Sequence, residues 1–133
     1  DTLNAIKLNK QLFNNISKER IRDEINKILL SNNPQYIKKL YNVGIMDYII
    51  PELSKCFKCE QNNPYHIYNV GDHIINSLKY TNNDLILRLI LLFHDVGKPN
   101  CKTTTNHDHF YNHGKISSKI SINILKRLKY DNK

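Results

Sequence analysis

Apolar residues recur at three- and four-residue spacing along most of this chain, and this spacing limits the fold more than any other feature. Between residues 17 and 30, for instance, the apolar stripe consists of Ile21, Ile25, Ile28 and Leu29. Such a stripe runs along one side of an α-helix, with charged residues on the other side. Nothing in the first half alternates with the period of two that marks a half-buried strand. The sequence therefore predicts an all-α fold.

Capping residues mark where the first helices begin and end. After an irregular helix over residues 2–15, Ser17 can cap the next helix, because its side chain accepts a hydrogen bond from a free backbone N–H at the helix start. Asn33-Pro34 is typical of the first residues of a third helix, and Gly44 of its end. The first third of the chain is thus predicted to be a series of short helices.

A possible domain boundary follows. Residues 45–50 read as a short apolar turn that Pro51 stops, and residues 51–63 as a connector containing Pro51, two cysteines and two asparagines. We therefore expect a helical leader over residues 1–62 and a second helical domain over residues 63–133.

Three helices are expected in that second domain. The first starts at Asn63-Pro64 and ends near Tyr80, the second is capped by Asn83 or Asp84 and ends at His94, and the last starts near His113. The stripe expected to be buried in the first of these is Ile67, Val70, Ile74 and Leu78, and that in the last is Ile116, Ile120, Ile124 and Leu128.

Chemically distinctive residues follow the apolar run Leu85–Phe93. The run ends in His94-Asp95, and Gly97 then favours the end of the helix. An aspartate at a helix C-terminus is unfavourable next to the negative end of the helix dipole, so Asp95 needs a compensating cation. Imidazole and carboxylate groups both bind divalent cations.

The candidate metal ligands are His73, His94 and Asp95, and the ion would be Mg, Mn, Ni, Co or Zn. Three protein ligands leave coordination positions open for water and a phosphate oxygen, as a catalytic site requires. Taken one at a time, a core histidine and an ordinary helix-end pair would explain these residues equally well.

The ordered set of His73, then His94-Asp95-Val96-Gly97-Lys98, then His113 resembles the HD superfamily of metal-dependent phosphohydrolases, from about residue 64 to 120. More narrowly, residues 18–29 and Ile50-Pro51-Glu52-Leu53 resemble the HD-bearing bacterial tRNA nucleotidyltransferases, the CCA-adding and poly(A) polymerase group. This narrower resemblance covers nearly the whole chain. It implies a helical HD-domain bundle preceded by a short helical leader.

The resemblance also implies roles for individual residues. Asp95 and Lys98 would be catalytic, and His66, Lys98 and His113 would bind the substrate. Beside a metal ion, Lys98 could hold phosphate or protonate a leaving group, although a solvated turn lysine is an equal alternative on sequence alone. His113 lies in Phe110-Tyr111-Asn112-His113, which matches the Phe-x-x-His stretch of the family.

The sequence departs from the family pattern in several places. The wider superfamily supplies another aspartate from a later helix, but the only carboxylate after His113 is Asp131. Asn69 stands where the narrower group often has Asp. The Gly-Ser motif and paired aspartates of a nucleotidyltransferase head are also missing, so this chain alone should not polymerise nucleotides.

Charge and cysteine content bear on partners and location. A net charge of +8 suits a polyanion such as tRNA, with Lys126, Arg127 and Lys129 as candidate phosphate contacts, although it equally fits a lysine-coated surface. Cys56 and Cys59 have zinc-knuckle spacing, but a structural site needs four ligands and only one other thiol exists. Three reduced cysteines, with no membrane-spanning run, predict a cytoplasmic protein.

Two functions remain open at this stage. The first is a metal-dependent phosphohydrolase acting on a phosphomonoester or a cyclic nucleotide phosphate, with a nucleotide or an RNA-end phosphate as substrate. The alternative is a tRNA-binding module of a tRNA nucleotidyltransferase whose HD site is vestigial.

The polar loop over residues 100–112, with His107, His109 and three threonines, is expected to be mobile. It is either a lid over phosphate or a disordered surface loop.

Overall fold

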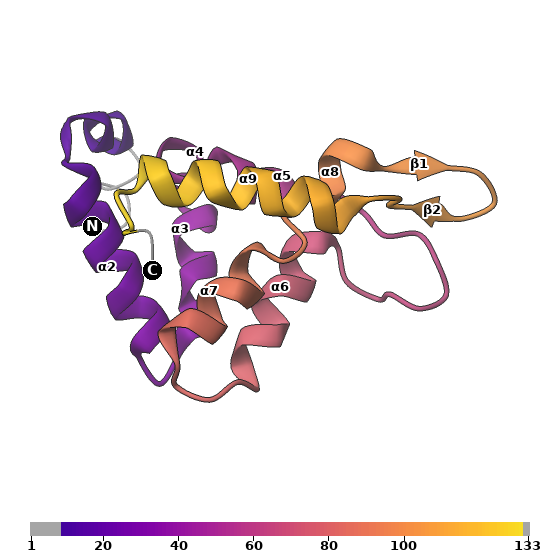
Figure 1. Ribbon diagram of the computed structural model, residues 1–133, viewed down its shortest axis with the longest axis horizontal. Helices are drawn as coiled ribbons and strands as arrows, with labels where there is room; N and C mark the ends of the chain where they lie inside the picture. The colour runs from indigo at the N-terminus through magenta and orange to yellow at the C-terminus, as the bar shows by residue number, and fades with distance from the viewer. Residues whose placement is uncertain (1–8, 132–133) are drawn as a thin grey trace.

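A computed structural model describes residues 9–131, which form a bundle of short helices (Figure 1). The α-helices are α2 (Lys18–Leu30), α3 (Lys38–Asn42), α4 (Met46–Ile49), α5 (Pro51–Cys56), α6 (Val70–Lys79), α7 (Leu85–Phe93), α8 (Lys98–Cys101) and α9 (His113–Arg127). Two 3-10 helices, η1 (Lys10–Asn15) and η2 (Pro34–Ile37), flank α2. Within residues 9–131 the only strands are β1 (Thr103–Thr104) and β2 (Asp108–His109). The predicted all-α fold is confirmed, and residues 2–8 of the first expected helix lie outside the described part.

The first long helix, α2, forms as its sequence predicts. The Ser17 side chain accepts a hydrogen bond of 3.2 Å from the Arg20 N–H and so caps the helix. Ile21, Ile25 and Leu29 form its buried side. The third expected helix begins at Pro34 with a 3-10 turn that continues into α3, and the chain turns at Gly44 with φ of 85°.

The prediction of a connector at residues 51–63 is wrong for its first half. Pro51 was expected only to stop the preceding apolar turn, but it is the first residue of helix α5. Proline lacks only an N–H that would be unpaired in the first helical turn, so this position suits it. Leu53, Cys56 and Phe57 are all buried, and their helical spacing anchors the new helix in the core.

The helix expected from Asn63-Pro64 starts six residues later, at Val70. The Asn69 side chain accepts a 2.7 Å hydrogen bond from the Asp72 N–H, which is the capping interaction at the true start. Residues before it form a loop in which Ile67, expected to be buried, is 88% exposed. Both Asn63-Pro64 and Asn69 can start a helix. The helix starts after Asn69, which directly precedes the buried stripe of Val70, Ile74 and Leu78.

The expected structureless loop at residues 100–112 is also wrong, since it contains a short antiparallel hairpin. Thr103 pairs with His109 and Thr104 with Asp108. The Thr104 hydroxyl also donates a hydrogen bond of 2.7 Å to the Asp108 carboxylate. Two-residue strands carry no detectable alternation, so the sequence pattern could not reveal them.

One hydrophobic core unites helices from both sides of the expected boundary. The cluster includes residues of α2 such as Leu29, residues of α7 such as Leu92, and Ile124 and Leu128 at the end of α9. Figure 1 shows α9 running along the long axis of the molecule, with the hairpin extending beyond its N-terminal end. The division into residues 1–62 and 63–133 stays a prediction. Within the described residues, no helix is long and apolar enough to cross a membrane.

Arg88 joins the two parts of this core. Its side chain is only 5% exposed, although it lies on the mostly apolar helix α7. The guanidinium donates hydrogen bonds to the backbone oxygens of Leu29 and Ser31 at the end of α2, and to Thr81 O at 3.2 Å. Carbonyls at a helix C-terminus lack partners within the helix and attract cations, so a buried arginine is well placed there.

We expect Arg88→Met to lower the free energy of unfolding by about 2 to 3 kcal/mol, because it leaves several buried carbonyls without a donor. Lys79→Met, on the exposed end of α6, is the matched control and should change stability by less than about 0.5 kcal/mol. Urea denaturation followed by circular dichroism measures both. Equal stabilities for the two variants would show that Arg88 does not join α2 to α7.

A candidate metal and phosphate site

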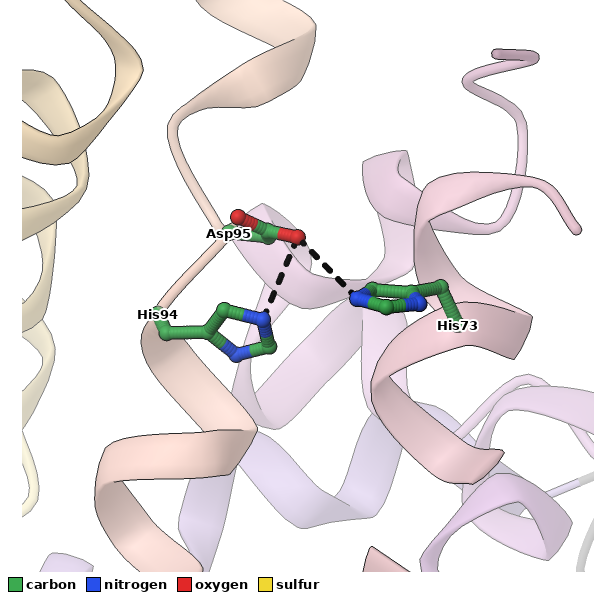
Figure 2. A group of neighbouring side chains, drawn as sticks. All are labelled: His73, His94 and Asp95. Carbon is green, nitrogen blue, oxygen red and sulfur yellow. Dashed lines mark ion pairs between the residues drawn. The ribbon is translucent and has the colours of Figure 1, made fainter. Parts of the chain in front are cut away.

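The candidate site is built around the carboxylate of Asp95, which is 3% exposed and immediately follows α7 and its C-cap, His94. Its Oδ2 atom lies 3.2 Å from His94 Nε2, 3.6 Å from His73 Nε2 and 3.1 Å from Lys98 Nζ. Its Oδ1 atom lies 3.3 Å from His113 Nε2. Figure 2 shows the two imidazoles of His73 and His94 turned toward the carboxylate from separate helices. Four basic groups thus surround one buried anion.

Backbone hydrogen bonds fix which nitrogen of His94 and His113 faces Asp95. His94 Nδ1 lies 2.6 Å from Leu91 O, and His113 Nδ1 lies 2.9 Å from Phe110 O. A carbonyl only accepts, so each Nδ1 carries the proton and each Nε2 is left toward Asp95. This arrangement is typical of metal-binding histidines, whose second nitrogen is held by a backbone oxygen.

The pair formed by His94 Nε2 and Asp95 Oδ2 requires a positive charge. In a neutral imidazole with Nδ1 protonated, Nε2 is an acceptor, and it would face another acceptor at 3.2 Å. Either a proton on Nε2 or a cation between the two atoms removes this repulsion. His73, His94 and Asp95 each offer one ligand atom, and these atoms lie within 4.8 Å of one another. These three side chains therefore can hold a metal ion.

The pKa values of the cluster follow from the same contacts. Burial alone would raise the pKa of Asp95, but the hydrogen bond from His94 and the charges of His94 and Lys98 outweigh it and hold that pKa well below its usual range. The hydrogen bond to Asp95 raises the pKa of His94 above its ordinary value, against the effect of burial. Burial lowers the pKa of His73 despite the nearby carboxylate.

Lys98 is not the solvated turn lysine that the sequence allowed. It is 6% exposed, and its ammonium group donates to Gln61 Oε1 at 2.9 Å while pairing with Asp95. Sequence reasoning missed Gln61, which is 4% exposed and also donates from its Nε2 to Tyr68 O. No spacing signal marked it, because it lies in the connector and reaches the site only through the fold.

His66 lies at the edge of this group. Its ring is 5.8 Å from the His73 ring, edge to face, although the expected shared helix would have separated the two residues by about 10.5 Å along its axis. The loop before α6 folds back and brings them together. Among the other histidines, His107 is exposed and His109 stacks on Tyr111 with ring centroids 5.2 Å apart. The role of the hairpin as a lid stays a prediction.

The cysteines do not form a metal site with other described His, Cys, Asp or Glu side chains, since the one group with metal-ligand spacing is the histidine and aspartate set. Cys56 and Cys59 are buried, and burial raises the pKa of Cys56 to about 12. These properties fit inert core thiols.

The His94 titration offers a test of the cluster. In metal-free protein kept with a chelator, Asp95→Asn should lower the pKa of His94, because it removes the acceptor that stabilises the imidazolium. Since the folded-state pKa of His94 lies above its unfolded value near 6.5, its contribution to stability is complete below that pH and is lost as the pH rises through the folded value.

Asp95→Asn should abolish this loss of stability with rising pH, because the His94 imidazolium no longer has its acceptor. Two-dimensional NMR of the imidazole signals measures the pKa, and Asp47→Asn, at an exposed position of α4, is the charge-matched control. An unchanged His94 pKa in Asp95→Asn would contradict the close pairing of these two side chains.

Comparison with known proteins gives an independent indication of family. A family model described as "Probable RNA and SrmB- binding site of polymerase A" matches residues 1–57. The A-adding tRNA nucleotidyltransferase of Deinococcus radiodurans is 32% identical over 120 residues, covering 84% of this chain and 27% of that protein. The CCA-adding enzyme of Blochmanniella pennsylvanica is 31% identical over 121 residues, covering 86% of this chain and 29% of that protein.

A third relative, the Multifunctional CCA protein of Tolumonas auensis, is 27% identical over 125 residues, covering 90% of this chain and 30% of that protein. No solved structure gives a significant match. The chain spans less than a third of the length of these relatives. The similarities cover most of the chain, so they include Asp95 as well as part of the segment that matches the family model. On this evidence the chain is similar to a region of tRNA nucleotidyltransferases.

Proposed function

We propose that this chain is an RNA-binding part of a tRNA nucleotidyltransferase-like protein and that it contacts the phosphate backbone of tRNA. The observation that supports this most strongly is the match of residues 1–57 to an RNA-binding family model. The relatives, named as A-adding and CCA-adding enzymes, point to tRNA as the kind of RNA. The net charge of +8 supplies the electrostatic attraction that such binding needs.

The structure distinguishes basic residues that are available from those already paired. Arg127, a candidate phosphate contact in the sequence, instead binds both carboxylate oxygens of Glu52 at 2.7 and 2.8 Å. On α9, Lys115, Lys119 and Lys126 are exposed on one side of the helix and make no ion pair with another described residue. In the matched segment, Lys39 and Lys55 are also exposed, and the Lys39 ammonium lies 4.0 Å from the centroid of the Tyr36 ring.

Replacing these exposed lysines should weaken tRNA binding and reduce its dependence on salt. The double variants Lys119→Gln/Lys126→Gln and Lys39→Gln/Lys55→Gln should each lower the slope of log K against log salt by about one unit for every lysine that contacts a phosphate. Fluorescence anisotropy with labelled tRNA at several salt concentrations measures the slope.

The control removes the same charge from lysines that already have a partner. Lys27 pairs with Glu24 at 3.0 Å and Lys38 with Asp72 at 2.7 Å, so Lys27→Gln/Lys38→Gln should change the slope much less. If all three double variants have the wild-type slope, the exposed lysines only make the surface soluble.

A second candidate function, metal-dependent phosphohydrolysis, is favoured by the Asp95 cluster. The supporting observation is the pair of facing acceptors on His94 and Asp95, which a bound cation would separate. A divalent metal held by His73, His94 and Asp95 would polarise a phosphoryl oxygen and lower the pKa of a bound water. The substrate would be a nucleotide or an RNA-end phosphate, and the assignment to the HD superfamily stays a prediction.

Lys98 and His113 would hold the substrate in this proposal. The Lys98 ammonium is already buried against Asp95 and Gln61, so it needs no further desolvation to meet a phosphate oxygen. His113 Nε2 faces the other oxygen of Asp95, and this side chain is 39% exposed, so the group is reachable from solvent. The His66 ring lies 5.8 Å from that of His73, and in this proposal it contacts the far end of a substrate.

We expect Asp95→Ala to abolish binding of Mn²⁺ or Ni²⁺ and any hydrolysis of a phosphomonoester or a 2′,3′-cyclic nucleotide, while leaving tRNA affinity within about twofold of wild type. Isothermal titration with the metal and a phosphate-release assay measure the two losses. Asp47→Ala is the control. If wild-type protein binds neither ion and Asp95→Ala behaves identically, the cluster is a vestigial ion-pair network, and RNA binding remains as the function.

A further inference from the structure

Two loops beside the Asp95 cluster carry exposed aromatic and apolar side chains. In the loop before α6, Tyr65 and Ile67 are each 88% exposed, and Tyr68 is 41% exposed. Just after the hairpin, Tyr111 is 67% exposed. Figure 1 shows this loop and the hairpin extending from the same end of the molecule. Large apolar groups held in water at one place are typical of a binding surface.

The two loops are joined to each other by a set of polar contacts. The Asn62 N–H donates to Asp108 Oδ2 at 2.7 Å, and the Asp108 N–H donates to Asn62 O at 3.1 Å. Lys102 adds to these contacts, because it donates to Glu60 O at 2.9 Å and pairs with Asp108 at 3.2 Å. Tyr65 lies three residues after Asn62 on one loop, and Tyr111 lies three residues after Asp108 on the other. The contacts between Asn62 and Asp108 therefore hold the segments that carry the two tyrosines in a fixed relative position.

The ring of Tyr111 is held in place before any ligand arrives. It stacks on His109 with an angle of 10° between the rings, and His109 Nε2 lies 3.0 Å from the Thr105 hydroxyl. A ring held in this way loses little conformational freedom when a flat ligand stacks on its exposed side.

Both loops lead directly into the site. His66 is the residue after Tyr65, and its ring lies 5.8 Å from that of His73. On the other loop, His113 is two residues after Tyr111 and contacts Asp95. A chain bound along these loops would thus reach the Asp95, Lys98 and His113 groups at one end.

We propose that Tyr65 and Tyr111 form a stacking platform for the unpaired nucleobases at an RNA end, with the terminal phosphate directed toward Lys98 and His113. This inference rests on the proposed RNA-binding function and names the part of the RNA that these loops recognise. Aromatic rings bind unpaired bases by stacking, whereas paired bases within a helix do not expose their faces.

The surroundings of the platform favour nucleic acid over an apolar protein segment. His107 and His109 lie on the hairpin, Lys102 lies at its base paired with Asp108, and Lys98 lies at the inner end paired with Asp95, so the rings are interspersed with basic side chains. Aromatic rings within a basic surface are the usual composition of a single-strand binding site. An interface for an apolar helix would instead present a continuous aliphatic stripe.

The test compares two RNA hairpins that differ only in the bases of a four-nucleotide 3′ tail. One carries an ordinary unpaired tail and the other an abasic tail with the same phosphates. By anisotropy, we expect wild-type protein to bind the ordinary tail more tightly. Tyr65→Ala/Tyr111→Ala should lose roughly tenfold in affinity or more for that RNA and little for the abasic one. Tyr65→Phe/Tyr111→Phe should retain the preference, because the rings remain.

Tyr80→Ala is the matched control, since Tyr80 is 83% exposed at the opposite end of α6. Equal wild-type affinity for the two hairpins, or an unchanged preference in the double alanine variant, would overturn the platform while leaving phosphate-directed RNA binding in place. If wild-type protein binds neither hairpin nor tRNA, both the platform and the proposed RNA-binding function are wrong.

Discussion

The buried charge of Asp95 is the constraint on which the arrangement of the second half depends. A carboxylate that is 3% exposed must be compensated, and the compensation comes from α6, the end of α7, α8 and the start of α9. Holding four elements around one anion demands close packing. Gly97 meets this demand, because an added Cβ would lie 2.6 Å from Ser117 N on α9. The Gly97 N–H also donates to Ser117 Oγ at 2.8 Å, which fixes α8 against α9.

Apolar periodicity and capping residues were sufficient for the helical fold class and for most helices. They failed where the same residue can signal two structures. Pro51 and Pro64 both precede apolar residues, yet only Pro51 starts a helix, because Leu53 and Phe57 reach the core whereas Ile67 points to solvent. The hairpin was missed because its two-residue strands are too short to show alternation, and because its contacts with Asn62 come from a segment distant in sequence. Tertiary contacts, not local preference, decided these cases.

Some residues of the candidate site could likewise be predicted from the sequence, and others could not. His73, His94, Asp95, Lys98 and His113 were recognisable from their order and their chemistry, and the structure brings them together. Gln61 was not recognisable, because a lone glutamine in a connector has no spacing signal. Nor could the sequence show that Arg127 forms an ion pair with Glu52, whereas Lys119 and Lys126 are exposed. Side-chain pairing across the fold determines which charges are available to a ligand.

The arginine that joins α2 to α7 also shapes how the molecule opens. Because Arg88 holds the last carbonyls of α2, α7 cannot separate locally without exposing the end of α2, and the two helices share one hydrophobic cluster. They should therefore exchange their amide hydrogens as one cooperative unit, at a rate set by global unfolding. Residues 63–69 and the hairpin add no side chain to the buried apolar cluster, so their amides can exchange through smaller, more frequent openings. The segment that meets a ligand can thus rearrange without disturbing the part that keeps the chain folded.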